Sequence, residues 1–421
     1  MEDDGSRIPP YSSVFLRMQR LRNIIRSSPL APVARRIYRR ITLLLIRVLL
    51  SRRRVPKPAD ENRDTFVFGN DHLGDVVVRL PFLDALSRRA RGRSGRMVVV
   101  VAPAYADFMR RTGVADHVIA LSREETLSLY QWRRVRRLLH RELAPFHFRE
   151  AVNSIHMGHL PQDDLFMTAI SAQESFGSFD PVFQNYAVLD SSHLPYGHFY
   201  RYDRAMTVHG NDREYCRFIT GEAPKCREVT SFMPRLTEEE QAALPRIPDC
   251  CYAIVPGAQA AFRRWPTAKF ATVCNWLLER DPHVHVAILG SKDEAPLASA
   301  VIGEIGDKSR MVDLTGRTSI LQLGAILPRF RLVVSNETGT AHFAMMLGVP
   351  VISILGGGHY GGFEPNPQCR TEHCVTVDDH RCFRCGWHCS KNNDISQPHP
   401  CIAGITTEQV ITAICNAEAK A

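Results

Sequence analysis

Three short segments of the chain combine residue types that suit proton transfer and anion binding. The first contains Gly69, Gly74 and Asp75, in which two glycines allow a tight turn and the aspartate stands near the start of a predicted helix. A carboxylate at such a turn can accept a proton from a bound hydroxyl. The alternative is that Asp75 only caps the helix and complements its dipole.

The second segment offers cations beside the start of another predicted helix. Gly257 opens the turn, and Arg263 and Arg264 come just before the helix predicted for residues 267–280. Two guanidinium groups beside a helix N-terminus form an anion site that suits a pyrophosphate. The alternative is that both arginines lie on the surface and that Trp265 only packs in the core.

The third segment presents free backbone N–H groups and two hydroxyls at the start of a further predicted helix. Its candidate donor-binding residues are Glu337, Thr338, Gly339, Thr340 and His342. The N–H groups and hydroxyls suit a phosphate or a ribose. Capping and packing are the alternative roles for Glu337 and His342.

Each of these segments connects a predicted strand to a predicted helix. The predicted strands are 65–69, 97–102, 251–255, 284–289, 311–314, 331–335 and 350–355, and the predicted helices are 75–90, 267–280, 295–305, 319–330 and 338–347. Continuous apolar strands that alternate with helices are typical of a parallel sheet covered on both faces, so the fold class is α/β with two doubly wound domains. Ligands of such sheets bind at the carboxyl ends of the strands, and the cleft between the domains is the expected site.

The length of the chain also indicates more than one domain. Its 421 residues exceed the size of one hydrophobic core, and its 44% hydrophobic and 23% charged residues exclude a disordered or fibrous protein. We expect an N-terminal arm at residues 1–59, one α/β domain at residues 60–235 and a second at residues 236–421. A proline-rich stretch at residues 234–248 separates the two domains.

The positive charge of the chain is concentrated in the arm. Residues 5–59 contain 13 Arg, one Lys and no acidic residue, and Glu2, Asp3 and Asp4 precede them, which leaves about −2 of the net charge of +9 for residues 60–421. This asymmetry favours a basic amphipathic arm on an anionic membrane and argues against a nucleic-acid partner. Apolar residues within 33–50 recur at helical spacing, as in a helix lying on a bilayer, and their longest run is too short to cross one. A disordered tail and an organellar transit peptide are the alternatives.

Five of the 12 cysteines lie within residues 374–401. Four of them have a spacing that suits a tetrahedral metal site, and they are Cys382, Cys385, Cys389 and Cys401. Zinc and iron both suit four thiolates. Unliganded thiols and disulfides are the alternatives to metal. Histidines that can replace one of the thiolates are His380, His388 and His399.

The order of the short motifs carries a further indication. The motifs are Leu73–Val77 with Leu80 and Pro81, Pro256–Ala258, Arg263–Pro266, Asp313–Ser319, and Glu337–Ala344 with Gly348–Pro350. This ordered set resembles glycosyltransferase family 9, the heptosyltransferases, over about residues 64–415. The resemblance implies the GT-B architecture, in which two Rossmann-like domains face each other across a cleft. It places the acceptor on the N-terminal domain and a nucleotide-sugar donor, ADP-heptose, mostly on the C-terminal one.

The resemblance also implies roles for individual residues in an inverting transfer that needs no cofactor. Asp75 matches the catalytic aspartate that deprotonates the acceptor hydroxyl. Arg263 replaces a frequent Lys and is expected to neutralise the leaving diphosphate, and Glu337 replaces a frequent Asp near the donor. Gly356–His359 replaces the usual Gly-Pro-Thr. The other predicted donor-binding residues are Gly74, Gly257, Arg264, Thr338, Gly339, Thr340 and His342.

The acceptor implied by the resemblance is lipopolysaccharide, another glycan or a protein of the cell envelope. The expected location is the cytoplasmic face of the inner membrane of a Gram-negative bacterium. The cysteine cluster resembles the iron-binding four-cysteine finger of the autotransporter heptosyltransferases, and we expect a structural or assembly role for it. Two other classes remain open: a GT-B-like nucleotide-sugar epimerase, and a non-enzymatic metal-finger protein whose arm binds nucleic acid.

Overall fold

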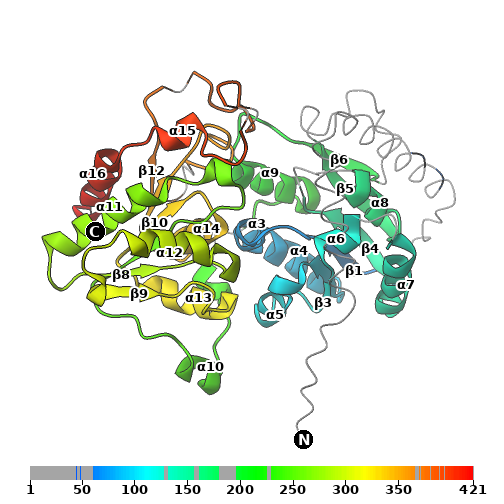
Figure 1. The fold of residues 1–421 in the computed structure, drawn as a ribbon. Helices are drawn as coiled ribbons and strands as arrows, with labels where there is room; N and C mark the ends of the chain where they lie inside the picture. The colour runs from blue at the N-terminus through cyan, green and yellow to red at the C-terminus, as the bar shows by residue number, and fades with distance from the viewer. Residues whose placement is uncertain are drawn as a thin grey trace, which may run out of the picture.

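The computed structural model describes residues 44, 48, 60–127, 131–155, 161–179, 196–224, 229–365, 369, 371–379, 381–387, 389–392 and 394–420. Two six-stranded sheets lie side by side in this structure (Figure 1). Of the predicted arm, only Leu44 and Val48 are described, and both are helical and exposed. The rest of the arm, with its predicted membrane contact, lies outside the described residues.

The first sheet has the strand order β3-β2-β1-β4-β5-β6, and all neighbouring strands are parallel. Its strands are β1 (Asp64–Phe68), β2 (Met97–Val101), β3 (His117–Ala120), β4 (Phe148–Asn153), β5 (Ala172–Phe179) and β6 (His198–Arg201). The accompanying helices are α3 (Leu73–Val78), α4 (Leu80–Gly92), α5 (Pro103–Arg111), α6 (Arg123–Leu127), α7 (Trp132–Leu143), α8 (Pro161–Met167) and α9 (Val208–Thr220). β1 and β2 are buried along their whole length, which explains the uninterrupted apolar sequence of β2 and of residues 66–68 in β1.

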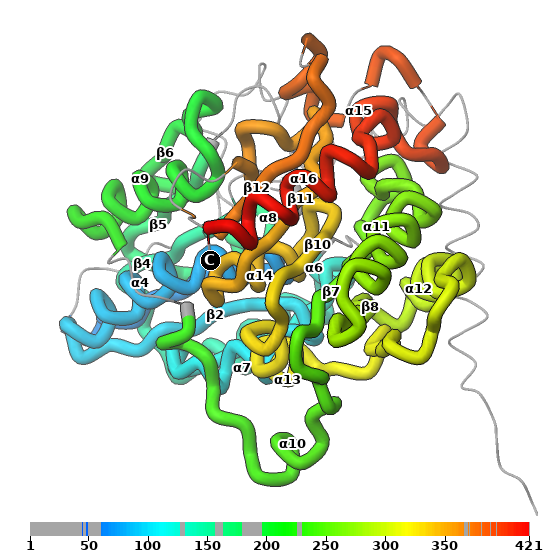
Figure 2. The backbone as a smooth tube through the Cα atoms, turned by 90° about the vertical axis from the view of Figure 1, so that its left-hand side faces the viewer, coloured from blue at the N-terminus to red at the C-terminus, as the bar shows by residue number. Residues whose placement is uncertain are grey.

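The second sheet repeats this topology, since its order is β12-β11-β10-β7-β8-β9. Its strands are β7 (Cys251–Val255), β8 (His285–Ile288), β9 (Met311–Asp313), β10 (Leu332–Asn336), β11 (Val351–Ile354) and β12 (Glu372–Val375). Its helices are α10 (Glu238–Ala242), α11 (Thr267–Arg280), α12 (Ala295–Gly303), α13 (Ile320–Ile326), α14 (Gly339–Met346), α15 (Pro400–Ala403) and α16 (Thr407–Glu418). Figure 2 shows α16 alongside α11, and α10 projecting away from the sheet.

Both sheets have the Rossmann order, so the predicted α/β class with two Rossmann-like domains is confirmed. The strand order reverses between β1 and β4 in the first sheet and between β7 and β10 in the second. The three motif turns follow β1, β7 and β10, and they therefore lie at these two reversal points. Such points are where doubly wound sheets bind ligands at the carboxyl ends of their strands.

One predicted helix is divided in two. The sequence predicts a single helix over residues 75–90, whereas the structure has α3 and α4 separated at Arg79. Pro81 lies in the first turn of α4 and has no N–H to donate to the carbonyl of Val77. The single helix was a wrong prediction, and the break gives Arg79 a position between the two helices.

The two domains meet along α3 and α14, which lie at the centre of Figure 1. The first turns of these helices pack so closely that a Cβ on Gly74 would lie 3.0 Å from His342 Cδ2. The core is continuous across the junction, where the rings of Phe108 and Phe343 lie 6.0 Å apart. The segments that contain the predicted catalytic and donor-binding residues therefore lie at the boundary between the two domains.

Candidate active site between the two domains

A cavity of about 860 Å³ lies between the domains, at the carboxyl ends of both sheets. From the N-terminal domain it is lined by residues that include Asp71, Asp75, Arg79, Tyr105 and Arg123. From the C-terminal domain the lining includes Arg263, Glu337, Thr338, Gly339, Thr340, His342 and His359. The predicted base and most of the predicted donor-binding residues therefore face one space.

Asp75 lies in the first turn of α3, and its side chain is 15% exposed. Its carboxylate is 3.7 Å from Arg79 Nη2, and no described residue forms a hydrogen bond with it. Burial and the charge of Asp71 raise the pKa of Asp75 to about 7, although Arg79 and His342 oppose this shift. Asp75 thus forms no capping hydrogen bond, although its place in the first turn still complements the dipole of α3. Its pKa lies in the range that suits a general base.

Arg79 fixes the position of three carboxylates beside this base. It is 4% exposed, and it lies 3.0 Å from Asp71, 3.7 Å from Asp75 and 3.6 Å from Asp212. Burial raises the pKa of Asp71, but Arg79 and Arg123 outweigh this effect and lower it to about 2. Asp71 is therefore a permanent anion, and its charge keeps a proton on Asp75 to higher pH.

Glu337 is the centre of a charged cluster on the opposite wall. It is 6% exposed, and its carboxylate accepts hydrogen bonds from Arg263 Nη2 and, at 2.7 Å, interacts with His359 Nδ1. Its other oxygen lies 3.3 Å from His342 Nε2. Burial raises the pKa of Glu337, but His359 and Arg263 hold it well below its usual value. The cluster is accordingly an anion surrounded by one guanidinium and two imidazole groups.

His342 supplies a second cation to the cavity wall. Burial lowers its pKa, but the hydrogen bond to Glu337 and the charge of Glu364, 3.7 Å away, raise it to about 9. Glu364 is fully buried and is hydrogen-bonded by Ser353 Oγ, and burial raises its own pKa to about 8. His342 is therefore protonated at neutral pH, and it lies between the Glu337 carboxylate and the Glu364 carboxyl group.

Further hydrogen-bond donors belong to residues of the cavity wall. Within the described part of the chain, Arg263 Nε is buried without a hydrogen-bond partner. The hydroxyl of Thr338 caps α14 by accepting from Ala341 N, and the next two residues, Gly339 and Thr340, line the cavity with first-turn N–H groups. A guanidinium beside a helix N-terminus suits a diphosphate.

Comparisons with known proteins show which family the chain resembles. A family model described as glycosyltransferase family 9 (heptosyltransferase) matches residues 224–386. Lipopolysaccharide heptosyltransferase 3 of Escherichia coli is 28% identical over 106 residues, which are 24% of this chain and 30% of that protein. Lipooligosaccharide heptosyltransferase 2 of Haemophilus influenzae is 24% identical over 149 residues, 32% of this chain and 42% of that protein. The chain is similar in sequence to the heptosyltransferases of this family over residues 224–386. Its predicted resemblance to glycosyltransferase family 9 is confirmed, although the alignments span less than half of either relative.

Solved structures extend the likeness in fold to both domains of the chain. A family 9 glycosyltransferase of Veillonella parvula has a TM-score of 0.64 at 18% identity, covering 86% of this chain and 99% of that one. E. coli ADP-heptose lps heptosyltransferase II has a TM-score of 0.59 at 15% identity, covering 85% and 100%. E. coli heptosyltransferase WaaC with ADP-2-deoxy-2-fluoro heptose has a TM-score of 0.59 at 14% identity, covering 85% and 100%. At these identities the likeness shows the fold, and the GT-B architecture is confirmed.

Two of the predicted donor-binding residues do not line the cavity. Gly257 packs against Glu294, whose Oε1 would lie 1.8 Å from a Cβ at that position. Arg264 donates from Nε to the carbonyl of Ala258 at 2.9 Å and thereby stabilises the turn that follows β7. Trp265 is 1% exposed and packs in the core, as its alternative role predicts.

Sequence reasoning missed several residues of the cavity wall. They are Asp71, Arg79, Tyr105 and Arg123, and the approach of His359 to Glu337 was also not foreseen. The spacing of Asp75 and Arg79 by four residues was an available signal, because such residues are neighbours on a helix. Arg123 is brought in by the turn after β3, where its Nη1 donates to the carbonyl of Asn70 at 2.9 Å, and no local pattern indicates this contact.

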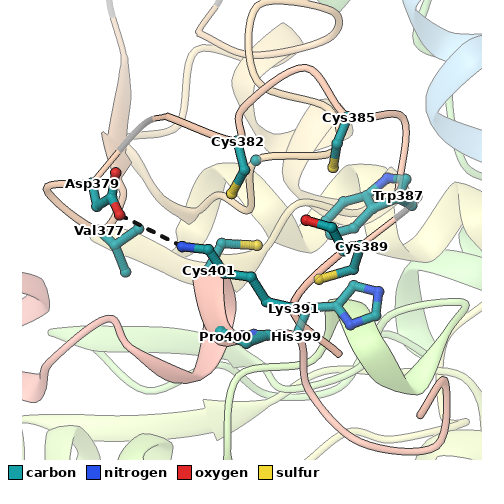
Figure 3. Close-up of a pocket in the computed structure, with 12 residues that line it drawn as sticks. Val377, Asp379, Cys382, Cys385, Trp387, Cys389, Lys391, His399, Pro400 and Cys401 are labelled. Atoms are coloured by element: carbon teal, nitrogen blue, oxygen red, sulfur yellow. Dashed lines mark ion pairs between the residues drawn. The ribbon is translucent and has the colours of Figure 1, made fainter. Parts of the chain in front are cut away.

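The four predicted metal ligands line a second pocket of about 190 Å³. Cys382, Cys385, Cys389 and Cys401 are free thiols whose sulfur atoms point toward one another (Figure 3). Burial raises the pKa of Cys401, and the charges of the other three thiols raise it further. A bound cation would relieve this repulsion, so the donor set fits a metal ion.

The spacing of these sulfur atoms is wider than in a closed site. Among the described residues, only Glu364, Glu372 and Cys374 offer three potential ligand atoms within 4.8 Å of one another. Binding of one ion by the four thiols therefore requires their side chains to move closer together. Of the alternative histidine ligands, His399 lines the same pocket, whereas His380 and His388 lie outside the described residues.

Proposed function

We propose that this heptosyltransferase-like protein is an inverting glycosyltransferase that moves a heptose from ADP-heptose to an acceptor hydroxyl. One observation carries the proposal. Asp75, with its pKa raised to about 7, lines the same interdomain cavity as Arg263, Glu337 and His342. This arrangement combines one base with a cationic pocket, which are the two elements that a displacement at a sugar carbon requires.

In the proposed reaction, Asp75 accepts the proton of the acceptor hydroxyl while its oxygen attacks the anomeric carbon. The new carbon–oxygen bond forms opposite the diphosphate, and the bond from the anomeric carbon to the diphosphate oxygen breaks. The electron pair leaves with ADP. A single displacement of this kind inverts the anomeric configuration. The raised pKa of Asp75 suits the step, because a base is most effective when its pKa lies near the working pH.

The leaving diphosphate gains negative charge as this bond breaks. Arg263, with its unpartnered Nε, and the protonated His342 supply positive charge on the donor wall. The N–H groups of Gly339 and Thr340 at the start of α14 add hydrogen-bond donors. The side chains and helix terminus provide this stabilisation without a catalytic metal.

The names of the relatives support the choice of donor and acceptor. Two are lipopolysaccharide or lipooligosaccharide heptosyltransferases, and one similar structure contains an ADP-heptose analogue. We propose a lipopolysaccharide, another envelope glycan or a protein as the acceptor, and a location on the cytoplasmic face of the inner membrane, bound through the basic arm. The structure's described helices include none with the length and apolarity to span a membrane.

We also propose that the thiols of the second pocket hold a structural zinc or iron ion. The residues that would hold it are Cys382, Cys385, Cys389 and Cys401, and the ion would tie the loop of residues 382–389 to α15. Metal analysis of the purified protein is expected to find about one ion per chain. A Cys385→Ser variant that retains the same metal content would contradict this ligand set.

The proposed activity is tested with a panel of nucleotide sugars. ADP-heptose is expected to raise the melting temperature of the protein more than UDP-N-acetylglucosamine or GDP-mannose, because a ligand stabilises the state that binds it. Release of ADP is expected only when a heptose-accepting lipopolysaccharide is present. Isomerisation of a nucleotide sugar without acceptor would instead identify an epimerase.

A further inference from the structure

The cysteine pocket and the proposed donor site meet at one side chain, Trp387. This residue lines the cysteine pocket and lies in the loop between Cys385 and Cys389 (Figure 3). The Trp387 ring also lies 5.5 Å from Arg263 Cζ and 5.2 Å from the ring of His359. Both of these residues bind the Glu337 carboxylate. One indole therefore contacts the cysteine pocket and two members of the charged cluster.

The three glycines after β11, Gly356–Gly358, pack against the loop that contains Trp387. A Cβ on Gly358 would lie 2.1 Å from Trp387 Cδ2, and a Cβ on Gly356 would lie 2.7 Å from Trp387 Cη2. A Cβ on Gly357 would lie 2.6 Å from Phe383 Cδ1. No side chain fits at these positions while the loop stays in place. The glycines thus let the cysteine loop pack directly on the backbone that leads to His359.

The turn that carries Arg263 is held by the same part of the chain. Phe262, its neighbour, lies 5.5 Å from the Trp387 ring and 4.8 Å from the ring of His399. The carbonyl of Phe262 accepts a hydrogen bond from His399 N at 3.0 Å. Since His399 also lines the cysteine pocket, the pocket supports the Arg263 turn through both rings.

The loop itself has an unfavourable backbone conformation. Arg384 and Trp387 have φ values of 66° and 65°, in the left-handed region that side chains rarely adopt. Such residues persist only where their surroundings hold them. Here the surroundings are the cysteines on either side of Trp387, so a change in the cysteine pocket is expected to move the indole first.

We propose that Trp387 is a positioning residue that couples the cysteine pocket to Arg263 and His359, so that the pocket sets the affinity of the protein for the diphosphate of its donor. The inference rests on the proposed function, because it assumes that the charged cluster binds a diphosphate. It assigns to the cysteine pocket an effect on donor binding, beyond the structural role expected from its sequence. Sites coupled through such a contiguous set of contacts affect each other's affinity reciprocally.

The first test is the affinity for ADP, measured by titration calorimetry. Trp387→Ala is expected to weaken ADP binding about tenfold, and Trp387→Phe to restore most of it, because a ring then still lies over Arg263. Trp276→Ala is the matched control: Trp276 also lies beside an arginine, with Arg280 Cζ 4.7 Å from its ring, but near the far end of α11. Near-UV circular dichroism checks that each variant is folded. Equal ADP affinity in the folded wild-type, Trp387→Ala and Trp276→Ala proteins overturns the inference.

A double-mutant cycle separates positioning from a general structural role. In an Arg263→Ala background, Trp387→Ala is expected to weaken ADP binding less than about threefold, since the group that it positions is gone. A merely structural tryptophan would give the same loss in both backgrounds, and that result contradicts the proposal.

A third measurement tests whether a change in the cysteine pocket itself affects ADP binding. Cys385→Ser is expected to weaken ADP binding in the same direction as Trp387→Ala, whereas Cys415→Ser, at an exposed cysteine of α16, is expected to leave it unchanged. Wild-type affinity in Cys385→Ser overturns the coupling. If the wild-type protein itself binds neither ADP nor any nucleotide sugar, the proposed function fails and this inference fails with it. Normal wild-type binding with unresponsive variants removes the inference alone.

Discussion

At the scale of single residues, the cleft contains two aspartates, Asp71 and Asp75, that lie beside the same arginine, Arg79. Their pKa values are shifted in opposite directions. Asp71 is nearer to Arg79, at 3.0 Å against 3.7 Å for Asp75, and it also has Arg123 at 3.9 Å. Asp71 therefore stays ionised, and its charge raises the pKa of Asp75. Environments that separate the pKa values of two acids in this way distinguish a fixed anion from a working base.

The first prediction concerns the pH dependence of transfer. Because Asp75 must be ionised to accept a proton and its pKa is about 7, kcat/KM is expected to rise from pH 6 to pH 8. In Asp71→Asn this rise is expected at lower pH, since burial remains but the like charge is removed. Initial rates of ADP release between pH 5 and pH 9 measure both profiles. A rate independent of pH between 6 and 8 would exclude Asp75 as the base.

The second prediction concerns the free energy of unfolding. The folded pKa of Asp75 lies above its unfolded value, so the stability that its proton provides is present at acid pH and is lost as pH rises from about 4 to about 7. Asp75→Asn is therefore expected to be more stable than the wild type at pH 8. The pKa of Asp71 is lowered, so Asp71→Asn is expected to lose about 1–3 kcal/mol at the same pH. Urea unfolding of both variants at pH 8 measures the contrast, and the same sign for both would contradict it.

At the scale of elements, the site depends on how closely α3 approaches α14. A Cβ on Gly74 would meet Gly339 Cα at 3.3 Å, and a Cβ on Gly339 would meet Gly74 N at 3.0 Å. Two glycines that face each other bring the helix of the base within reach of the helix of the diphosphate site. This contact gives both residues a physical role that a tight turn alone does not explain.

The third prediction follows from this contact. Gly74→Ala is expected to push α3 away from His342, and a displacement of this kind typically lowers kcat by about tenfold to 100-fold. Gly92→Ala is the control, because a Cβ at that helix end meets no atom within 4 Å. Transfer kinetics of the two folded variants provide the measurement. Equal kcat values would show that the helix contact does not position the base.

The sequence predicted the strands of the site better than the rest of the first domain. Strand 251–255 was predicted at its observed bounds, because a strand buried on both faces is an unbroken apolar run. β4 escaped prediction because it contains Glu150, which is fully buried and paired with Arg89 and Arg93 at 2.9 Å. A charged residue whose partners are distant in sequence has no local pattern that reveals its burial.

In the candidate site too, residues in local motifs were predicted, whereas residues that depend on contacts between distant segments were not. Asp75, Arg263 and Glu337 were found because each lies within or just after a strand-to-helix connection that has a recognisable motif. The contact of His359 with Glu337 and that of Arg79 with Asp212 join segments that are distant in the chain, so no local pattern indicated them. The link between the cysteine loop and Arg263 was likewise hidden, because Trp387 and Arg263 are distant in the chain and meet only in the fold.

At the scale of the whole molecule, charge is divided between a basic arm and a nearly neutral body. The 13 arginines of residues 5–59 contrast with about −2 for residues 60–421. A charged surface of lipid attracts such an arm, each cation adding about 1 kcal/mol near the surface. The arrangement suits an enzyme that acts on an acceptor embedded in a membrane.

The fourth prediction concerns this arm. Deletion of residues 1–58 is expected to release the protein from vesicles that contain anionic lipid, while transfer to a soluble acceptor fragment continues at the rate of the full chain. Co-sedimentation at low and high salt measures the binding, and salt is expected to weaken it in the full chain. Persistent sedimentation of the truncated protein would place the membrane contact in the folded body.

The central claim is that Asp75 performs the proton transfer while the opposite wall binds the donor. The most direct test compares ADP affinity and heptose transfer in the wild type and in Asp75→Asn, which keeps the shape of the side chain and removes its basicity. The account predicts ADP affinity within about twofold of the wild type and a transfer rate lower by about 10²–10⁴-fold. Transfer at the wild-type rate by a folded Asp75→Asn protein would contradict it.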